Sequence, residues 1–568
     1  MTAWDWSLIG VYFLFSLGVG LYFSRRAGRN LENFFISGRS LPWWIAGTSM
    51  VATTFGADTP LAVTEIVAKN GIAGNWLWWN FVFGGMLTVF LFARLWRRSE
   101  VLTDLEFIEL RYSGRPAALL RGFRALYLGL PINCMIMAWS ILAMSSILSV
   151  FFAFPKAQAI IISLGIAVIY SVLSGFWGVV ITDFVQFIMA MAGSVVLAVL
   201  SIQHVGGIGA LKYKILAKNP EALNFFPNLG STELPFLVFF VYIAVQWWST
   251  WYPGSEPGGG GYVAQRMLAT QNERHSVLAT LWFNIAHYAL RPWPWILVAL
   301  ASLVVFPDLA DPKLGYPKMM AAFLPAGLKG LMMAAFFGAF MSTIDTHLNW
   351  GASYIINDFY KRFIRRSGSV SHYIFVSRLA VVLLMVCAGL TAYWMNSIKE
   401  GWEILLAIGA GTGLVSILRW FWWRINAWCE ISATICSFIV AVVLMKTPLG
   451  RPGEWNWAIR MLLTVGVSTG IWVLVMFLTR PVSKVHLQYF FQKIQPQGFW
   501  KPFRGIMEKR ISSSRITQQI INWGLGVILV YGMLFGAGKM LLLQPFEGSF
   551  FLFVAGLAAF FLFKNMLK

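Results

Sequence analysis

The stretch SMVATTFGADTPLAVTEI, residues 49–66, decides the fold of this chain. It is apolar enough to lie within a bilayer, yet Gly56, Asp58 and Pro60 interrupt it. A second interrupted stretch, VQWWSTWYPGSEPGGGGYVAQRM, covers residues 245–267. Irregular backbone at membrane depth is stable only where it is buried in protein or lines a wet cavity, because lipid cannot satisfy free N–H and C=O groups. Two discontinuous helices in corresponding positions of two halves are typical of the binding site of a secondary transporter.

Composition places the chain among polytopic membrane proteins. It has 568 residues, of which 58% are hydrophobic and only 12% charged, whereas a soluble domain carries about a quarter charged residues. The net charge of +21 is expected from basic residues that flank spans on the cytoplasmic side, so we expect no nucleic-acid partner. The four cysteines lie in apolar segments without metal or disulfide spacing: Cys134, Cys387, Cys429 and Cys436.

About fifteen stretches are apolar enough to cross a bilayer, the first at 6–23 and the last at 549–564. Most Lys and Arg residues fall on one side if the N-terminus is placed outside, which predicts a C-terminus in the cytoplasm and a location in the plasma (inner) membrane. The start of the chain reads as a span rather than a cleavable signal peptide. The basic, aromatic loop 479–519 is expected to lie along the inner leaflet, in contact with membrane lipids.

Charged residues inside spans are costly and usually functional. This chain has six: Asp58, Glu65, Asp183, Glu256, Arg291 and Asp345. Ser342 and Thr343 add two adjacent hydroxyls, which either bond back to their own helix or face the broken segment near Asp58. Carbonyl oxygens freed by unwound backbone, together with hydroxyls, form a site suited to Na⁺.

Five stretches carry a resemblance to a known family: FFISGRSLPWWIAGTSMVATTFGAD (34–58), WGVVITDFVQF (177–187), YVAQRMLAT (262–270), MSTIDTHLNWGASYIINDFY (341–360) and the arginine-flanked end of 402–424. With them, residues 6–478 resemble the sodium/solute symporter family, relatives of the sodium/glucose cotransporters. The resemblance implies an all-α, LeuT-like fold of two inverted five-helix repeats, with one extra N-terminal and about four extra C-terminal helices. The expected parts are 1–42 (N-terminal span and loop), 43–203 (first repeat), 234–424 (second repeat) and 425–568 (accessory helices).

The resemblance also implies sodium sites. By alignment, one sodium ion is bound by the backbone carbonyls of Ala52, Phe55 and Ala339 and by the hydroxyls of Ser342 and Thr343. Some family members have a second sodium beside an aspartate, and the matching positions here are Asp183, Ser342, Asp345 and Thr346. Sodium is the expected coupling ion.

The solute site cannot be copied from the sugar-transporting relatives, because their Asn, Gln and Glu are replaced here by Thr54, Thr59 and about Phe81. Aromatic and polar residues near the two breaks are the local candidates: Thr54, Asp58, Asn80, Trp247, Trp248, Trp251, Glu256, Asn284, His287 and Arg291. The last three share a helical face and either line the same cavity or pair with Asp345 or Asp183.

These observations predict a sodium-coupled importer of a small polar solute that works by alternating access. A sugar or sugar derivative is favoured, and a carboxylate or amino acid, with Arg291 as a counter-charge, is the alternative. Two other classes stay open: a membrane-embedded sensor or channel, and an integral-membrane transferase. We expect no enzyme activity, because the six histidines lack metal or triad spacing.

Overall fold

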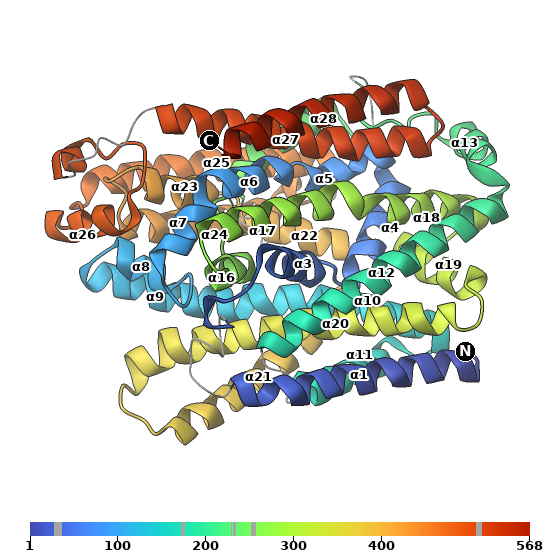
Figure 1. Cartoon of the computed structure of the whole chain (residues 1–568), viewed down its shortest axis with the longest axis horizontal. Helices are drawn as coiled ribbons and strands as arrows, with labels where there is room; N and C mark the ends of the chain where they lie inside the picture. The colour runs from blue at the N-terminus through green and yellow to red at the C-terminus, as the bar shows by residue number, and fades with distance from the viewer. Residues whose placement is uncertain are drawn as a thin grey trace.

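The computed structural model describes residues 1–27, 37–171, 176–228, 230, 234–250, 257–451, 453–506 and 514–567. These residues are almost entirely helical, and ten of their helices are long and apolar enough to cross a membrane. The bundle is elongated, and the two termini lie toward opposite ends of its long axis (Figure 1). The all-α polytopic architecture predicted from the sequence is confirmed.

The helices before residue 220 include the first broken helix and the elements around it. In chain order they are α1 (Ala3–Ala27), α3 (Trp43–Thr53), α4 (Asp58–Asn70), α5 (Trp76–Trp79), α6 (Phe81–Leu87), α7 (Ala93–Ser99), α8 (Glu106–Arg111), α9 (Gly114–Tyr127), α10 (Asn133–Phe152), α11 (Lys156–Ser171), α12 (Phe176–Val205) and α13 (Gly207–Lys218).

The second half also contains short helices around a break. Its elements are α14 (Phe236–Val241), α15 (Trp247–Ser249), α16 (Gly261–Ala269), α17 (Glu273–Ile285), η6 (Ala286–Leu290), α18 (Pro292–Val305), α19 (Gly315–Phe323), α20 (Leu328–Ser353), η8 (Tyr354–Ile364), α21 (Val370–Trp394), α22 (Ile398–Gly409) and α23 (Gly413–Phe421). The accessory elements are α24 (Ala427–Met445), α25 (Glu454–Leu478), α26 (Lys484–Ile494), η10 (Lys501–Ile506), α27 (Ser514–Leu541) and α28 (Pro545–Leu567).

Both predicted interruptions are real breaks in helices. The first separates α3 from α4 at residues 54–57. The second separates α15 from α16, and three of its glycines have positive φ: Gly258 (92°), Gly259 (76°) and Gly261 (51°). Such backbone is strained for any residue with a Cβ, so the glycine run is what allows the chain to turn sharply into α16.

A third break was not predicted, because residues 402–423 form one continuous apolar stretch in the sequence. The structure bends it by 48° between α22 and α23. The exposed backbone finds partners on α24, where the Ser437 hydroxyl donates to Ile408 O (2.6 Å) and accepts from Gly411 N (2.9 Å). A Cβ on Gly413 would collide with the backbone at Trp248 and Ser249. Close approach to the second broken segment therefore requires glycine at this bend.

Part of the loop 479–519, which the sequence predicts to lie along the inner leaflet, packs against the protein. Its helix α26 buries Leu487, Phe490, Phe491 and Ile494 and packs against α7 and α8. Trp500 is buried as well and donates its indole N–H to Trp420 O (3.0 Å). These aromatic side chains cover protein rather than lipid, because the ends of α7, α8 and α23 offer them an apolar surface.

Candidate functional site

The first break exposes the carbonyl end of α3 to polar side chains. Phe55 N–H donates to Ala52 O (2.9 Å), which closes one tight turn beyond the helix. Arg291, the N-cap residue of α18, donates to Val51 O and to Thr54 Oγ1 (3.0 Å each). Its guanidinium also lies 5.4 Å from the Phe55 ring and 4.9 Å from the Trp295 ring. A cation at the C-terminal end of a helix is favourable, because the free carbonyls carry partial negative charge.

The five residues expected to bind the first sodium ion come from α20 and the end of α3, and all five are buried. The two helices pack against each other, and a Cβ on Gly56 would lie 3.6 Å from Thr343 Oγ1. The Thr343 hydroxyl donates to Ala339 O (2.9 Å), and the Ser342 hydroxyl donates to Asp183 Oδ1 (2.5 Å). Both hydroxyl oxygens keep lone pairs. Hydroxyl and carbonyl oxygens are donors suited to a hard cation such as Na⁺.

Asp183 on α12 organises the neighbouring polar cluster. Its second oxygen accepts the Ser49 hydroxyl (2.9 Å), and Arg266 on α16 donates to Thr53 Oγ1 (3.1 Å) and approaches Ser49 Oγ (3.4 Å). The charge of Arg266 stabilises the buried carboxylate. The cation beside Asp183 is thus Arg266 rather than Arg291. Asp345 and Thr346 follow Ser342 by about one turn of α20 and are also buried.

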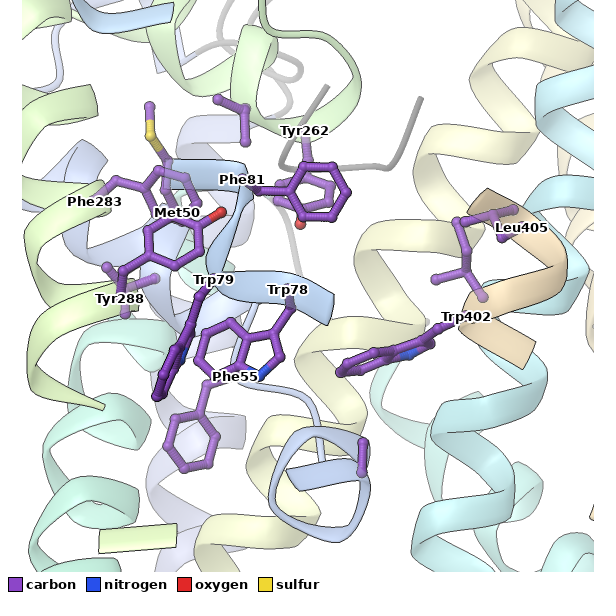
Figure 2. Packing of buried hydrophobic residues seen from close by; sticks show 14 of the residues in the cluster. Met50, Phe55, Trp78, Trp79, Phe81, Tyr262, Phe283, Tyr288, Trp402 and Leu405 are labelled. Atoms are coloured by element: carbon purple, nitrogen blue, oxygen red, sulfur yellow. The ribbon is translucent and has the colours of Figure 1, made fainter. Parts of the chain in front are cut away.

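A cavity of about 60 Å³ lies beside these clusters, between the two broken helices. Its wall is aromatic on several sides, from Trp78, Phe81, Trp139, Tyr262, Tyr288 and Trp402. Figure 2 shows the Trp402 ring extending from α22 toward Trp78, with Tyr262 and Phe81 on another side. Ligand sites usually measure about 300–1,000 Å³, so the walls have to move apart before a solute of sugar size enters.

Four of the ten predicted solute residues line this cavity: Thr54, Asp58, His287 and Arg291. The π-helix η6 produces this placement, because Arg291 N–H bonds to Ala286 O five residues back and so shifts the register of the helical face. His287 Nδ1 lies 3.2 Å from Thr54 Oγ1. Arg291 and Asp58 both line the cavity, which places a cation and an anion on its wall.

The other candidates lie elsewhere. Asn80 donates to Trp76 O and Leu77 O, and Asn284 donates to Thr280 O. Trp247 and Trp248 donate to the preceding helical turn, at Ile243 O and Ala244 O. Trp251 and Glu256 fall outside the described residues.

Sequence reasoning missed several residues of the cavity wall. Trp78, Trp139 and Trp402 come from three apolar segments, and a sequence with 28 tryptophans gives no signal that singles them out. His347 also lines the cavity and pairs with Asn133 Oδ1 (2.8 Å). Arg266 carried a usable signal, since it is a charge in a segment at membrane depth.

Asp104, between α7 and α8, is a further residue that the sequence did not suggest. Its Oδ2 accepts the N–H of Gly261 (3.0 Å), the first residue of α16. Its Oδ1 accepts the hydroxyl of Tyr354, the first residue of η8. One carboxylate therefore ties α16, the C-terminal half of the second broken helix, to the continuation of α20.

Two broken helices around a buried cavity, with an oxygen-rich cluster beside them, define a secondary transporter. The chain belongs to the sodium:solute symporter family, whose model matches residues 34–436. It is therefore a multi-pass membrane protein that couples solute transport to sodium.

The similarity to known transporters extends over most of the chain. A sodium/mannose cotransporter from Bos taurus is 24% identical over 474 residues, covering 75% of this chain and 76% of the relative. A sodium/glucose cotransporter from Vibrio parahaemolyticus is 24% identical over 476 residues, covering 79% and 86%. The solved structure of a Na⁺-coupled sialic acid symporter aligns with a TM-score of 0.67 and 19% identity, covering 85% of this chain and 99% of that one. This last likeness confirms the LeuT-like fold.

Proposed function

We propose that the transported solute is a sugar or sugar derivative, taken up together with sodium. The observation that carries the proposal is the cavity between the two broken helices, where indole rings of Trp78, Trp139 and Trp402 surround hydroxyl, imidazole and charged groups. Flat aromatic faces cover the apolar side of a solute, and a few polar groups fix its orientation. Curated relatives named as mannose, glucose and myo-inositol cotransporters support the same class.

A carboxylate or amino acid is the second candidate, because Arg291 lies at the cavity. The arrangement favours it less. Arg291 already donates to Val51 O and Thr54 and interacts with the charge of Asp58. An anionic solute would have to compete with these groups and would meet the Asp58 carboxylate. A neutral polyol would meet neither obstacle.

We propose that Ala52, Phe55, Ala339, Ser342 and Thr343 bind the coupling sodium. The packing of α3 on α20 and the all-oxygen donor set support this assignment. We further propose a second sodium site at Asp183, Ser342, Asp345 and Thr346. Asp183 and Ser342 are already joined by a hydrogen bond, and a cation there would add a charged partner near the buried Asp345.

The remaining proposals concern the membrane location, orientation, partners and domain limits of the protein. We place the chain in the plasma (inner) membrane with the N-terminus outside and the C-terminus in the cytoplasm, as the distribution of Lys and Arg favours. Its partners are then sodium, a small solute and membrane lipids, without nucleic acid. We propose transport rather than enzymatic, sensor or channel activity, with domain limits at 43–203, 234–424 and 425–568.

The test is uptake by the purified protein in proteoliposomes with an imposed inward sodium gradient. Labelled hexoses, inositols, acidic sugars, monocarboxylates and amino acids are compared, with a potassium gradient as the control. We expect concentrative uptake of one sugar class with sodium only. Sodium-driven uptake of a carboxylate or amino acid instead would reject the sugar assignment, and sodium currents without solute uptake would favour a channel or sensor.

A further inference from the structure

A second, larger cavity lies away from the transport site, at the end of the bundle where α8 and α26 lie (Figure 1). Its volume is about 490 Å³, which is within the usual range of about 300–1,000 Å³ for ligand sites. Its walls are formed by α9, by η8, by the loop before α8 and by the first residue of α8. Its polar lining includes Thr103, Arg121, Asn357, Lys361, Arg362 and Arg366. We call it the basic pocket.

Two of the four cations in the basic pocket are already neutralised. Arg121 lies 2.5 Å from Asp358 and 2.6 Å from Glu109, and Arg362 forms an ion pair with the other oxygen of Glu109. Glu106 accepts the N–H of Leu102 (3.0 Å) and lies 3.9 Å from Arg121. The carboxylates around the pocket thus have cationic or N–H partners.

The other two cations remain available to a ligand. Lys361 and Arg366 are exposed, and in the described part of the chain neither forms an ion pair with a carboxylate. Arg366 Nε donates to Arg362 O (3.2 Å), and Lys361 Nζ lies 5.5 Å from the Tyr373 ring. The pocket therefore presents two exposed cations without an ion-pair partner among the described residues, next to the neutral polar groups of Thr103 and Asn357, and its four cations outnumber the three carboxylates around them by one. This set of groups suits a phosphate, which accepts several hydrogen bonds and carries negative charge.

Neighbouring residues place the mouth of the pocket at the level of lipid headgroups. Helix α21 has 25 residues, a length of about 37 Å, which exceeds a hydrocarbon core of about 30 Å. Its first turn directly follows the exposed charges of Lys361 and Arg366, which are too costly to enter the core, so this end of α21 is the one expected in the headgroup layer. Ile374 and Phe375, on the next turn, are 48% and 67% exposed. Tyr373 precedes them and donates to Arg365 O (2.8 Å). Lys361 therefore lies beside the first residues of α21, at the membrane boundary.

An apolar surface accompanies the two cations. Phe363 and Ile364, at the end of η8, are 46% and 62% exposed. Apolar side chains beside Lys and Arg at a membrane boundary favour a lipid over a soluble anion, because acyl chains cover the first group while the headgroup meets the second.

We propose that the basic pocket binds the phosphate of an anionic lipid of the inner leaflet. Lys361 and Arg366 contact the phosphate, Thr103 and Asn357 supply hydrogen bonds, and the acyl chains lie over Phe363 and Ile364. The proposal rests on the orientation given under the proposed function. Since η8 continues α20, a lipid bound here contacts the helix that carries Ser342 and Thr343.

The test measures lipid binding without transport, so it is independent of the solute assignment. The full chain in detergent is titrated with short-chain phosphatidylglycerol, short-chain phosphatidylcholine or inorganic phosphate, and thermal stability is recorded. We compare the parent with Lys361→Gln/Arg366→Gln and with Lys446→Gln/Arg451→Gln. The control pair removes two exposed charges that follow the C-terminal end of α24 and do not line the basic pocket.

We expect phosphatidylglycerol to stabilise the parent and the control equally, and to bind the pocket double variant at least about tenfold more weakly. Equal binding by all three proteins would overturn the proposal, as would equal stabilisation by phosphatidylcholine. Stabilisation by inorganic phosphate at the same concentration would reject the lipid as the source. Should the double variant fail to fold, the single Lys361→Gln and Arg366→Gln variants give the same comparison, since both side chains are exposed.

Discussion

Replacing Asp104 by alanine is expected to loosen α16, the C-terminal half of the second broken helix. The substitution removes two hydrogen bonds to a carboxylate, one from Gly261 N–H (3.0 Å) and one from the Tyr354 hydroxyl. Hydrogen bonds to charged groups contribute about 1.5–3 kcal/mol each, so the pair holds α16 against η8 with at least about 3 kcal/mol. At about 1.4 kcal/mol per factor of ten, this corresponds to roughly a hundredfold shift toward states in which the two elements are apart.

Amide hydrogen exchange gives the readout. In Asp104→Ala, exchange over residues 261–269 should accelerate by about a hundredfold, whereas exchange in α27 stays unchanged. Asp104→Asn keeps an acceptor and loses the charge, so its effect should be intermediate. The exposed Asp308→Asn serves as the matched control. If α16 exchanges at the parent rate in Asp104→Ala, the carboxylate does not hold the helix and the reasoning is refuted.

Three further predictions concern the transport site. Ser342→Ala/Thr343→Ala should raise the sodium concentration for half-maximal uptake about tenfold or more. The control Ser163→Ala removes another buried hydroxyl that bonds to the backbone and should leave this concentration unchanged. Unaltered sodium dependence in the double variant would reject the first sodium site. Asp345→Asn should lower the Hill coefficient for sodium and the charge moved per solute, and a parent protein that moves one sodium per cycle would exclude the second site. Trp402→Ala should weaken the apparent solute affinity about tenfold through lost aromatic contact. The control Trp394→Ala changes a ring that is 71% exposed and should leave the affinity unchanged. Equal affinities in both variants would remove Trp402 from the solute site.

The sequence alone was sufficient to predict the class of protein and the positions of its two central helix breaks. Lipid cannot satisfy free backbone groups, so glycine, proline and acids inside apolar stretches had to mark backbone that is buried or wetted. Local chemistry also limited the choice of ion, since Ser342 and Thr343 next to an unwound segment offer oxygen donors only. These features depend on neighbours along the chain, which a sequence displays directly.

Only the tertiary structure decided which distant side chains meet. Arg266 rather than Arg291 accompanies Asp183, because α16 passes beside Ser49 and Thr53. Trp402 of α22 meets Trp78 and Trp139 of other helices at the cavity, and the bend after α22 is stabilised by Ser437, a residue of α24. Phe490 and Phe491 of α26 pack against protein for the same reason. Each of these outcomes is set by packing between segments far apart in the chain, and one-dimensional periodicity carries no information about such contacts.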